Sequence, residues 1–186
     1  MLDVEIYLPP GPVRYGSDAW HAAVQLAIQT AGEQGLTFGL HNCPGWSTAG
    51  GPWITPEQSM KELVWSELRV EGPLQEKRLM MERPNTRLDF YREVLVLAVP
   101  DREPVPVSRM IDLSERLKAD GSLHVSLPEG HWRIFRFGYT TTGKTNHPAQ
   151  PEGQGLESDK MDPDAVRHHF DQALGRIIRE AGSQAG

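Results

Sequence analysis

The stretch HNCPGWSTAGGPWITPEQSMK (residues 41–61) holds two of the five tryptophans and the single cysteine of this 186-residue chain. It directly follows residues 36–40, LTFGL, whose apolar alternation predicts a short β-strand. His41, Asn42 and Trp46 would then lie at the C-terminal end of that strand, where α/β folds place their binding loops. An imidazole, an amide and indole rings at such a position suit a polar, ring-shaped ligand such as a sugar. A structural loop anchored by its tryptophans is the alternative.

The residues before this stretch predict a β-α-β unit. Residues 3–8 alternate loosely as a strand, Ser17 is a good helix N-cap, and Gly35 supplies a left-handed helix end. Between them, apolar residues recur at helical spacing on one face: Trp20, Ala23, Val24, Ala27, Ile28 and Ala31. A strand, a helix and a tight turn into a second strand should place the two strands in parallel.

The apolar pattern changes from about residue 62. Short alternating runs follow, and Gly72-Pro73 and residues 128–130 predict turns between them. The run YREVLVLAVP at 91–100 is typical of a strand that is buried on both faces. Because no long amphipathic helix separates these runs, we interpret residues 62–137 as an antiparallel β region inserted into the α/β frame.

The C-terminal part begins with a long polar loop. Residues 140–160 have almost no apolar periodicity, as in loops that carry function. A helix follows, with Asp162 as its cap and Pro163 at its first position. Its predicted apolar stripe is Val166, Phe170, Ala173, Leu174, Ile177 and Ile178, while His168 and His169 are interpreted as structural or solvated. The predicted division is therefore 1–61, 62–137 and 138–186.

Composition argues against several classes of protein. The formal net charge is −6 and no Lys/Arg cluster stands out, which disfavours nucleic acid as a partner. No run of about twenty apolar residues is present, so no membrane span is expected. The N-terminal residues do not form a signal-peptide pattern. A single cysteine excludes an internal disulfide and a zinc site of the multi-cysteine kind.

Three blocks of sequence resemble one enzyme family. They are residues 41–61, GYTTTGKTN at 138–146 and EGQGLESDK at 152–160. In this order they resemble glycoside hydrolase family 106, whose members are α-L-rhamnosidases, and the resemblance extends from about Trp20 to Phe170. Family members are several times longer, so the chain resembles an N-terminal slice of the catalytic region. The resemblance implies the first elements of a (β/α)8 barrel, and inverting hydrolysis of terminal α-L-rhamnosyl linkages in plant-type glycans. It also implies a periplasmic or extracellular parent.

Two polar loops, 41–57 and 140–160, both follow strands that should point toward the same end of the predicted sheet, so we expect them to line one cleft. Trp46 and Trp53 could stack on a pyranose ring or bury their own rings beneath the loop. Glu157 has a structural ion pair with Lys160 as its alternative role. The candidate substrate-binding residues are His41, Asn42, Trp46, Trp53, Glu57, Thr142, Asn146, Glu157 and Asp159.

Glycoside hydrolysis needs two carboxyl groups, which lie roughly 6.5–9.5 Å apart in inverting enzymes. The resemblance places the catalytic glutamates beyond this chain, so no residue is assigned as the acid or the base, and we expect no turnover by the chain alone. The resemblance also implies calcium, for which Asn42 is the candidate ligand because calcium prefers carboxylate and amide oxygens. The expected partners are a carbohydrate containing α-L-rhamnose and the remainder of the parent enzyme.

Two other functions fit the same residues. The chain could be a carbohydrate-binding module without catalytic activity, which would require the β region to form a core of its own and the two polar loops to hold a sugar. It could also be a plain α/β structural domain with loops anchored by tryptophan.

Overall fold

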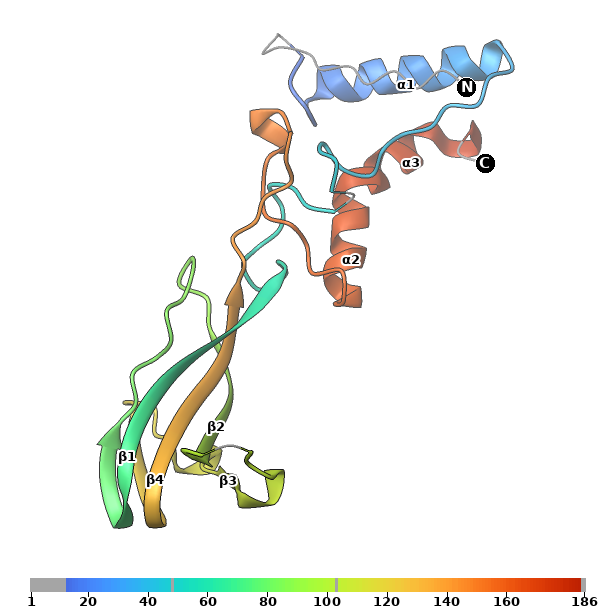
Figure 1. Ribbon diagram of the computed structural model, residues 1–186. Helices are drawn as coiled ribbons and strands as arrows, with labels where there is room; N and C mark the ends of the chain where they lie inside the picture. The colour runs from blue at the N-terminus through green and yellow to red at the C-terminus, as the bar shows by residue number, and fades with distance from the viewer. Residues whose placement is uncertain (1–12, 48, 103, 185–186) are drawn as a thin grey trace. The chain divides into compact units, whose positions relative to one another are not determined.

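A computed structural model describes residues 13–47, 49–102 and 104–184 of the chain (Figure 1). The chain divides into two compact units, each described here by itself. The sheet unit comprises residues 61–142. The helical unit comprises the described residues up to 60 together with those from 143 onward.

The sheet unit is a four-stranded antiparallel sheet. Its strands are β1 (Lys61–Met80), β2 (Arg92–Pro100), β3 (Ile111–Asp112) and β4 (Ser122–Thr141). Their order across the sheet is β1-β4-β2-β3, and all three pairings are antiparallel. The predicted antiparallel character of this region is therefore confirmed.

The two predicted turns in this region were wrong. Gly72 and Pro73 lie inside β1, and residues 128–130 lie inside β4, so that each strand is 20 residues long. The β1–β4 register instead shifts between Gly72 and Leu74 and again between Leu74 and Lys77. A β-bulge absorbs an extra residue while the strand keeps its direction, and β1 is an edge strand, where proline is tolerated.

One face of the sheet carries the core of this unit, and its buried members are Met81, Val96, Ala98, Leu113, Leu123, Val125, Leu127, Trp132 and Ile134. The expectation that β2 is buried on both faces was wrong, because Leu95 and Leu97 are only half-buried and the first three residues are exposed. Trp65 of β1 is the first ring of an aromatic row. Its ring centroid lies 6.5 Å from that of Phe137, and the Phe137 ring stacks on the Phe135 ring with 5.5 Å between centroids.

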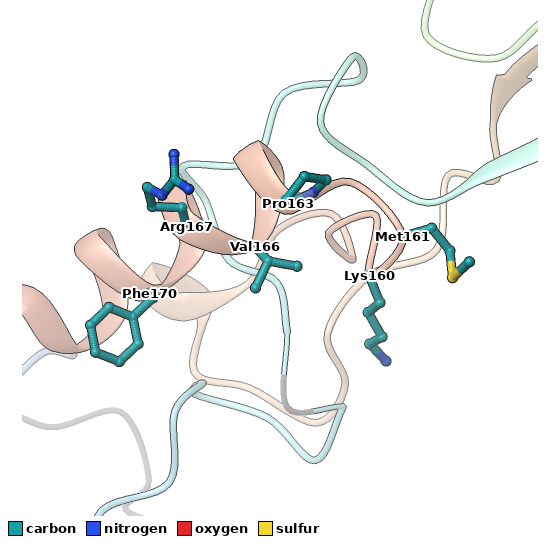
Figure 2. A pocket seen from close by; sticks show the side chains of 6 residues that line it. All are labelled: Lys160, Met161, Pro163, Val166, Arg167 and Phe170. Carbon is teal, nitrogen blue, oxygen red and sulfur yellow. The ribbon is translucent and has the colours of Figure 1, made fainter.

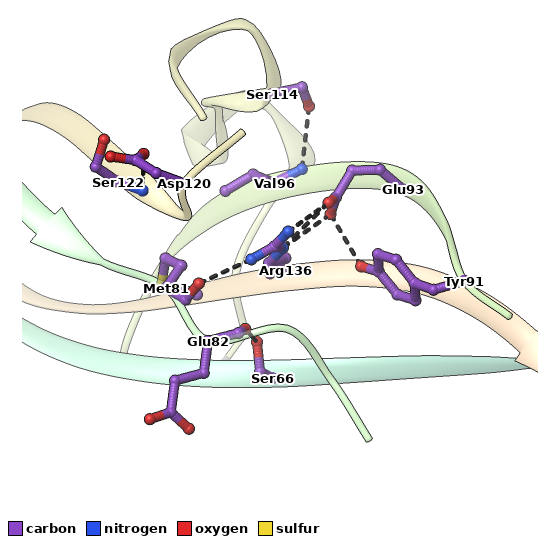
Figure 3. Close-up of polar contacts among 10 residues, drawn as sticks. All are labelled: Ser66, Met81, Glu82, Tyr91, Glu93, Val96, Ser114, Asp120, Ser122 and Arg136. Carbon is purple, nitrogen blue, oxygen red and sulfur yellow. Dashed lines mark hydrogen bonds and ion pairs between the residues drawn. The ribbon is translucent and has the colours of Figure 1, made fainter. Parts of the chain in front are cut away.

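A charged cluster joins β4 to β2 (Figure 3). Arg136 is only 6% exposed and donates hydrogen bonds of 2.8–3.2 Å to the Glu93 carboxylate. Its Nη1 also donates to the Met81 carbonyl at 2.8 Å, just beyond the end of β1. The Tyr91 hydroxyl donates to Glu93 at 3.0 Å. One buried guanidinium therefore satisfies acceptors from two separate segments of the sheet unit.

The helical unit begins with α1 (Asp18–Glu33), which confirms the predicted helix. The Ser17 hydroxyl accepts a 3.2 Å hydrogen bond from the Trp20 amide, and Gly35 takes a left-handed φ of +66° just after the helix. Residues 36–40, however, form no strand, and Leu36 is 66% exposed. A lone extended segment is not stable without a partner strand, and none pairs with it among the described residues. The predicted strand 3–8 lies outside those residues.

The C-terminal helices are α2 (Pro163–Phe170), a π-helical segment η4 (Asp171–Gly175) and α3 (Arg176–Ala181). The predicted N-terminus is confirmed: Asp162 accepts from the amides of Asp164 and Ala165, and Pro163 is the first residue. α3 packs along α1, where Arg176 pairs with Asp18 at 3.0 Å. Short 3-10 turns complete the chain at Val107–Arg109, Ser114–Arg116, Pro151–Gly153 and Gly182–Gln184. A (β/α)8 barrel is not seen in the described part.

Candidate functional site

The two polar loops of the helical unit pack against each other. Isolated antiparallel bridges join Gly51 to Leu156 and Ser59 to Ser158. The Met60 amide donates to the Glu157 carbonyl at 2.9 Å, and the Asp159 amide donates to the Gln58 carbonyl at 2.8 Å. The segments 41–60 and 143–160, far apart in the sequence, therefore form one joined surface.

Glycine makes this close approach possible. A Cβ atom built on Gly155 would lie 2.0 Å from the Gly51 carbonyl oxygen and 2.1 Å from its carbonyl carbon. Gly50 has a φ of +122°, and a Cβ there would lie 2.8 Å from the Leu156 carbonyl oxygen. Any larger residue at these positions would push two backbones apart.

Asn146 closes the second loop from the inside. Its side chain is fully buried, with Oδ1 accepting from the Gly155 amide at 2.7 Å and Nδ2 donating to the Gly153 carbonyl at 2.9 Å. Both ends of this amide are thus bonded to the backbone of its own loop. The structure places Asn146 beneath the loop surface, where its hydrogen bonds support the shape of the loop.

The first loop is fixed by His169, a residue that sequence reasoning assigned only a structural or solvated role. His169 lies on α2 and is 4% exposed. Its Nδ1 accepts from the Gly50 amide at 3.3 Å and from the Trp53 indole at 3.2 Å, and its Nε2 lies 2.9 Å from the Asn42 carbonyl. The neighbouring His168 Nε2 lies 3.2 Å from the Trp53 carbonyl.

These contacts determine the tautomer of His169. Because two N–H groups point at Nδ1, that nitrogen carries no proton, and Nε2–H donates to Asn42. Burial lowers the pKa of this ring below its ordinary value, against the opposing effects of the Asn42 carbonyl and the Glu157 charge. The imidazole is therefore neutral where an ordinary histidine would already begin to take up a proton.

The other predicted residues take different positions. Glu157 is 8% exposed and lies 3.8 Å from the Lys160 ammonium, which is the ion pair foreseen as its alternative role. Trp46 is 63% exposed, and Glu57 lies on the surface. The exposed His41 has its Nδ1 3.1 Å from the Cys43 carbonyl.

Two more candidates remain. Asp159 is half-buried, and its Oδ1 accepts from the Met161 amide at 3.0 Å. Thr142 is half-buried and is the last residue of the sheet unit.

A hollow of about 590 Å³ opens beside α2 (Figure 2). Its lining residues are Lys160, Met161, Pro163, Val166, Arg167 and Phe170. Val166 and Phe170 were expected to face the core, but they are 43% and 47% exposed. Val166 and Phe170 were therefore placed wrongly, and the helix turns Ala165 and His169 inward instead, because both ring nitrogens of His169 find partners there. Ala173 and Ile177 of the predicted stripe are buried, as expected.

A clue to His169 exists in the sequence. It lies four residues after Ala165 and four before Ala173, so that a histidine sits on a helix face of small residues. Small residues let a helix approach another backbone closely, where a two-nitrogen ring can bond to it.

Calcium near Asn42 stays a prediction. Within residues 13–47, 49–102 and 104–184, no three His, Cys, Asp or Glu side chains gather where they could hold a metal ion. His169 bonds to the backbone carbonyl of Asn42, and not to the side-chain amide that is the candidate ligand. No chemical step is therefore derived through calcium here.

The comparisons with known proteins agree with this architecture. Residues 7–96 and 86–186 match the family of glycoside hydrolases numbered 106, described as alpha-L-rhamnosidase, and the chain belongs to this family. It is similar to the rhamnosidase from Novosphingobium sp. PP1Y, with a TM-score of 0.75 and 21% identity over 97% of this chain and 33% of that chain. It is also 33% identical to a protein of Formosa agariphila named "Putative beta-glucuronidase", over all of this chain and 19% of that protein.

Two further findings concern the length of the chain relative to its relatives and the character of its helices. The chain spans one third of the solved rhamnosidase and about one fifth of the curated relative that it matches. None of the helices in the described part of the chain has the length and apolar character that crossing a bilayer requires.

Proposed function

We propose that this chain supplies part of the sugar-binding pocket of a glycoside hydrolase that removes terminal α-L-rhamnosyl residues from plant-type glycans. The observation that carries the proposal is the joining of the two polar loops, which lie within the family match. Buried Asn146 and His169 hold these loops from below. The half-buried Trp53 and the exposed Trp46 lie on these joined loops, where they could stack on a sugar ring.

The reaction would be hydrolysis with inversion. In such a reaction one carboxylic acid protonates the leaving oxygen, and a second carboxylate activates a water on the opposite face of the sugar ring. Glu157 is paired with Lys160 and Asp159 accepts from a backbone amide, so neither is arranged as a free acid or base. We therefore place the catalytic pair in the part of a family enzyme that this chain does not span. Calcium near Asn42 is a further proposal on which no step depends.

The proposal is tested by hydrolysis of p-nitrophenyl α-L-rhamnoside and p-nitrophenyl β-D-glucuronide, each with added calcium and with a chelator. Both the 186-residue chain and a family-length chain that contains it are assayed. We expect turnover of the rhamnoside by the longer chain only. Preference for the glucuronide would replace the sugar assignment with the one in the name of the Formosa relative. Turnover by the 186 residues alone would move the catalytic pair to Glu57, Glu157 or Asp159.

A carbohydrate-binding module without catalysis is the second candidate. It is favoured by the separate core of the sheet unit and by Trp65, which is 56% exposed beside Phe137. Calorimetric titration with methyl α-L-rhamnoside separates the two proposals. Loss of binding in Trp53→Ala supports the pocket of the helical unit, whereas loss in Trp65→Ala supports the module.

A further inference from the structure

One imidazole connects three separate points of the first polar loop. His169 binds the Asn42 carbonyl and the Gly50 amide, which are eight positions apart in the sequence, and it also binds the Trp53 indole. The rings of Trp53 and His169 lie 5.8 Å apart and are tilted by 35°. Two candidate sugar-binding residues therefore share one anchor, which comes from a helix more than a hundred residues away in the sequence.

We propose that His169 is the positioning residue of the candidate pocket, holding Trp53 and the backbone of Asn42 and Gly50 in the arrangement that binds sugar. Its link to sugar rests on the proposed function, whereas its link to the loop rests on the three hydrogen bonds alone. His169 is not a catalytic residue, because it is buried beneath the loop and all of its ring nitrogens are occupied.

The chemistry of the contacts explains why a histidine is needed. The anchor must accept from two N–H groups at one atom and donate to a carbonyl at another. A neutral imidazole combines an acceptor and a donor on one rigid ring. A phenyl ring of similar size would leave the Gly50 amide and the Asn42 carbonyl without these partners in a buried place.

The environment of His169 supports the same role. Ala165 and Ala173 on either side are 1% and 7% exposed, so small side chains bring α2 close to the loop. His168 adds a contact to the Trp53 carbonyl at 3.2 Å. Successive residues of α2 thus contact the backbone and the ring of the same tryptophan, which fixes both its position and its orientation.

The experiment follows the indole N–H signals of the ¹⁵N-labelled chain by NMR. Trp53→Phe assigns the Trp53 signal, and His169→Phe removes all three hydrogen bonds while keeping a ring in place. His169→Asn keeps an acceptor close to the position of Nδ1, and His131→Phe, at an exposed position of the sheet unit, is the matched control. The Trp132 indole, bonded to the Pro128 carbonyl at 3.1 Å, is the internal reference for folding.

We expect His169→Phe to move the Trp53 signal and to speed its hydrogen exchange, while the Trp132 signal stays in place. We expect His169→Asn to restore part of the shift and His131→Phe to leave the Trp53 signal unchanged. An unchanged Trp53 signal in His169→Phe would overturn the proposal, because the indole would then not depend on the ring.

The affinity for sugar is the second quantity to measure. We expect His169→Phe to weaken the affinity for methyl α-L-rhamnoside about tenfold and His169→Asn to recover much of it. A shifted Trp53 signal with unchanged sugar affinity would overturn the positioning role. If the wild-type chain binds no sugar, the proposed function fails, and the Trp53 signal still decides whether His169 holds the loop.

Discussion

Asn146 illustrates how much one buried side chain can decide. Its amide takes the place of a backbone pair between Gly153 and Gly155, at distances of 2.9 and 2.7 Å. The loop around it has little regular structure of its own, so its shape depends on this amide more than on an apolar core.

We predict that Asn146→Ala lowers the free energy of unfolding by about 2–3 kcal/mol, because it leaves a buried amide and a buried carbonyl without partners. Glu57→Ala, at an exposed position, is the control and should change stability by less than about 0.5 kcal/mol. Urea unfolding of both variants measures the difference. Equal stability of the two variants would contradict the supporting role assigned to Asn146.

Tyr91 should titrate late. Burial, followed by its hydrogen bond to Glu93 and the charge of that carboxylate, raises its pKa from 10.0 to about 12. Burial raises the pKa of Tyr15 to about 12 as well, with a smaller contribution from Cys43. Because the folded state holds these protons more tightly, the stability that they contribute is full below pH 10 and is lost as pH rises toward 12.

Ultraviolet titration of tyrosinate measures this directly. We expect the wild-type chain to retain protonated tyrosine well above pH 10, and Tyr91→Phe to remove one late-titrating group. Late titration that is unaffected by Tyr91→Phe would mean that burial and Glu93 do not protect this hydroxyl.

Between elements, the two polar loops of the helical unit cross each other at close range. Backbone meets backbone there at Gly51 and Gly155. A crossing of this kind tolerates no added atom, since no flexible side chain can move aside.

We predict that Gly155→Ala destabilises the chain by about 1–3 kcal/mol through overpacking. Gly39→Ala is the matched control, because a Cβ at Gly39 would meet nothing within 4 Å. Thermal unfolding of the two variants tests the difference. If both variants lose the same stability, the intrinsic preference of alanine, and not the crossing, would account for the change.

The elements also show where the sequence is informative. Ser17, Asp162 and Pro163 predict helix starts correctly, because a cap depends on a few neighbouring residues. Gly72-Pro73 was wrongly predicted to form a turn. The same dipeptide also fits a bulge in an edge strand, and only the pairing with the partner strand distinguishes the two. His169 agrees with the structural alternative given to it, but its partners could not be predicted because they lie more than a hundred residues away in the sequence. No local pattern reports contacts at that separation.

At the scale of the whole molecule, the sheet unit has a core of its own. Leu123, Val125 and Ile134 are completely buried within it. A sheet with such a core does not depend on covalent attachment to the helical unit for its apolar burial.

We predict that residues 61–142 expressed alone fold cooperatively, since this core is contained within them. Leu123→Ala should lower the stability of that fragment by about 2–5 kcal/mol through the cavity it leaves. Circular dichroism during heating tests both expectations. A fragment that shows no cooperative transition would mean that its burial is too small to hold the sheet together.

The reactivity of the Cys43 thiol can measure how often the first polar loop opens. Its thiol is 6% exposed and donates to the Gly45 carbonyl at 3.0 Å, and it is the only cysteine in the chain. A thiol reagent can react there only when the loop opens, so the labelling rate in the native chain, divided by the rate in the denatured chain, measures the opening equilibrium. Labelling of this one thiol thus reports the fraction of molecules in which the candidate pocket is open.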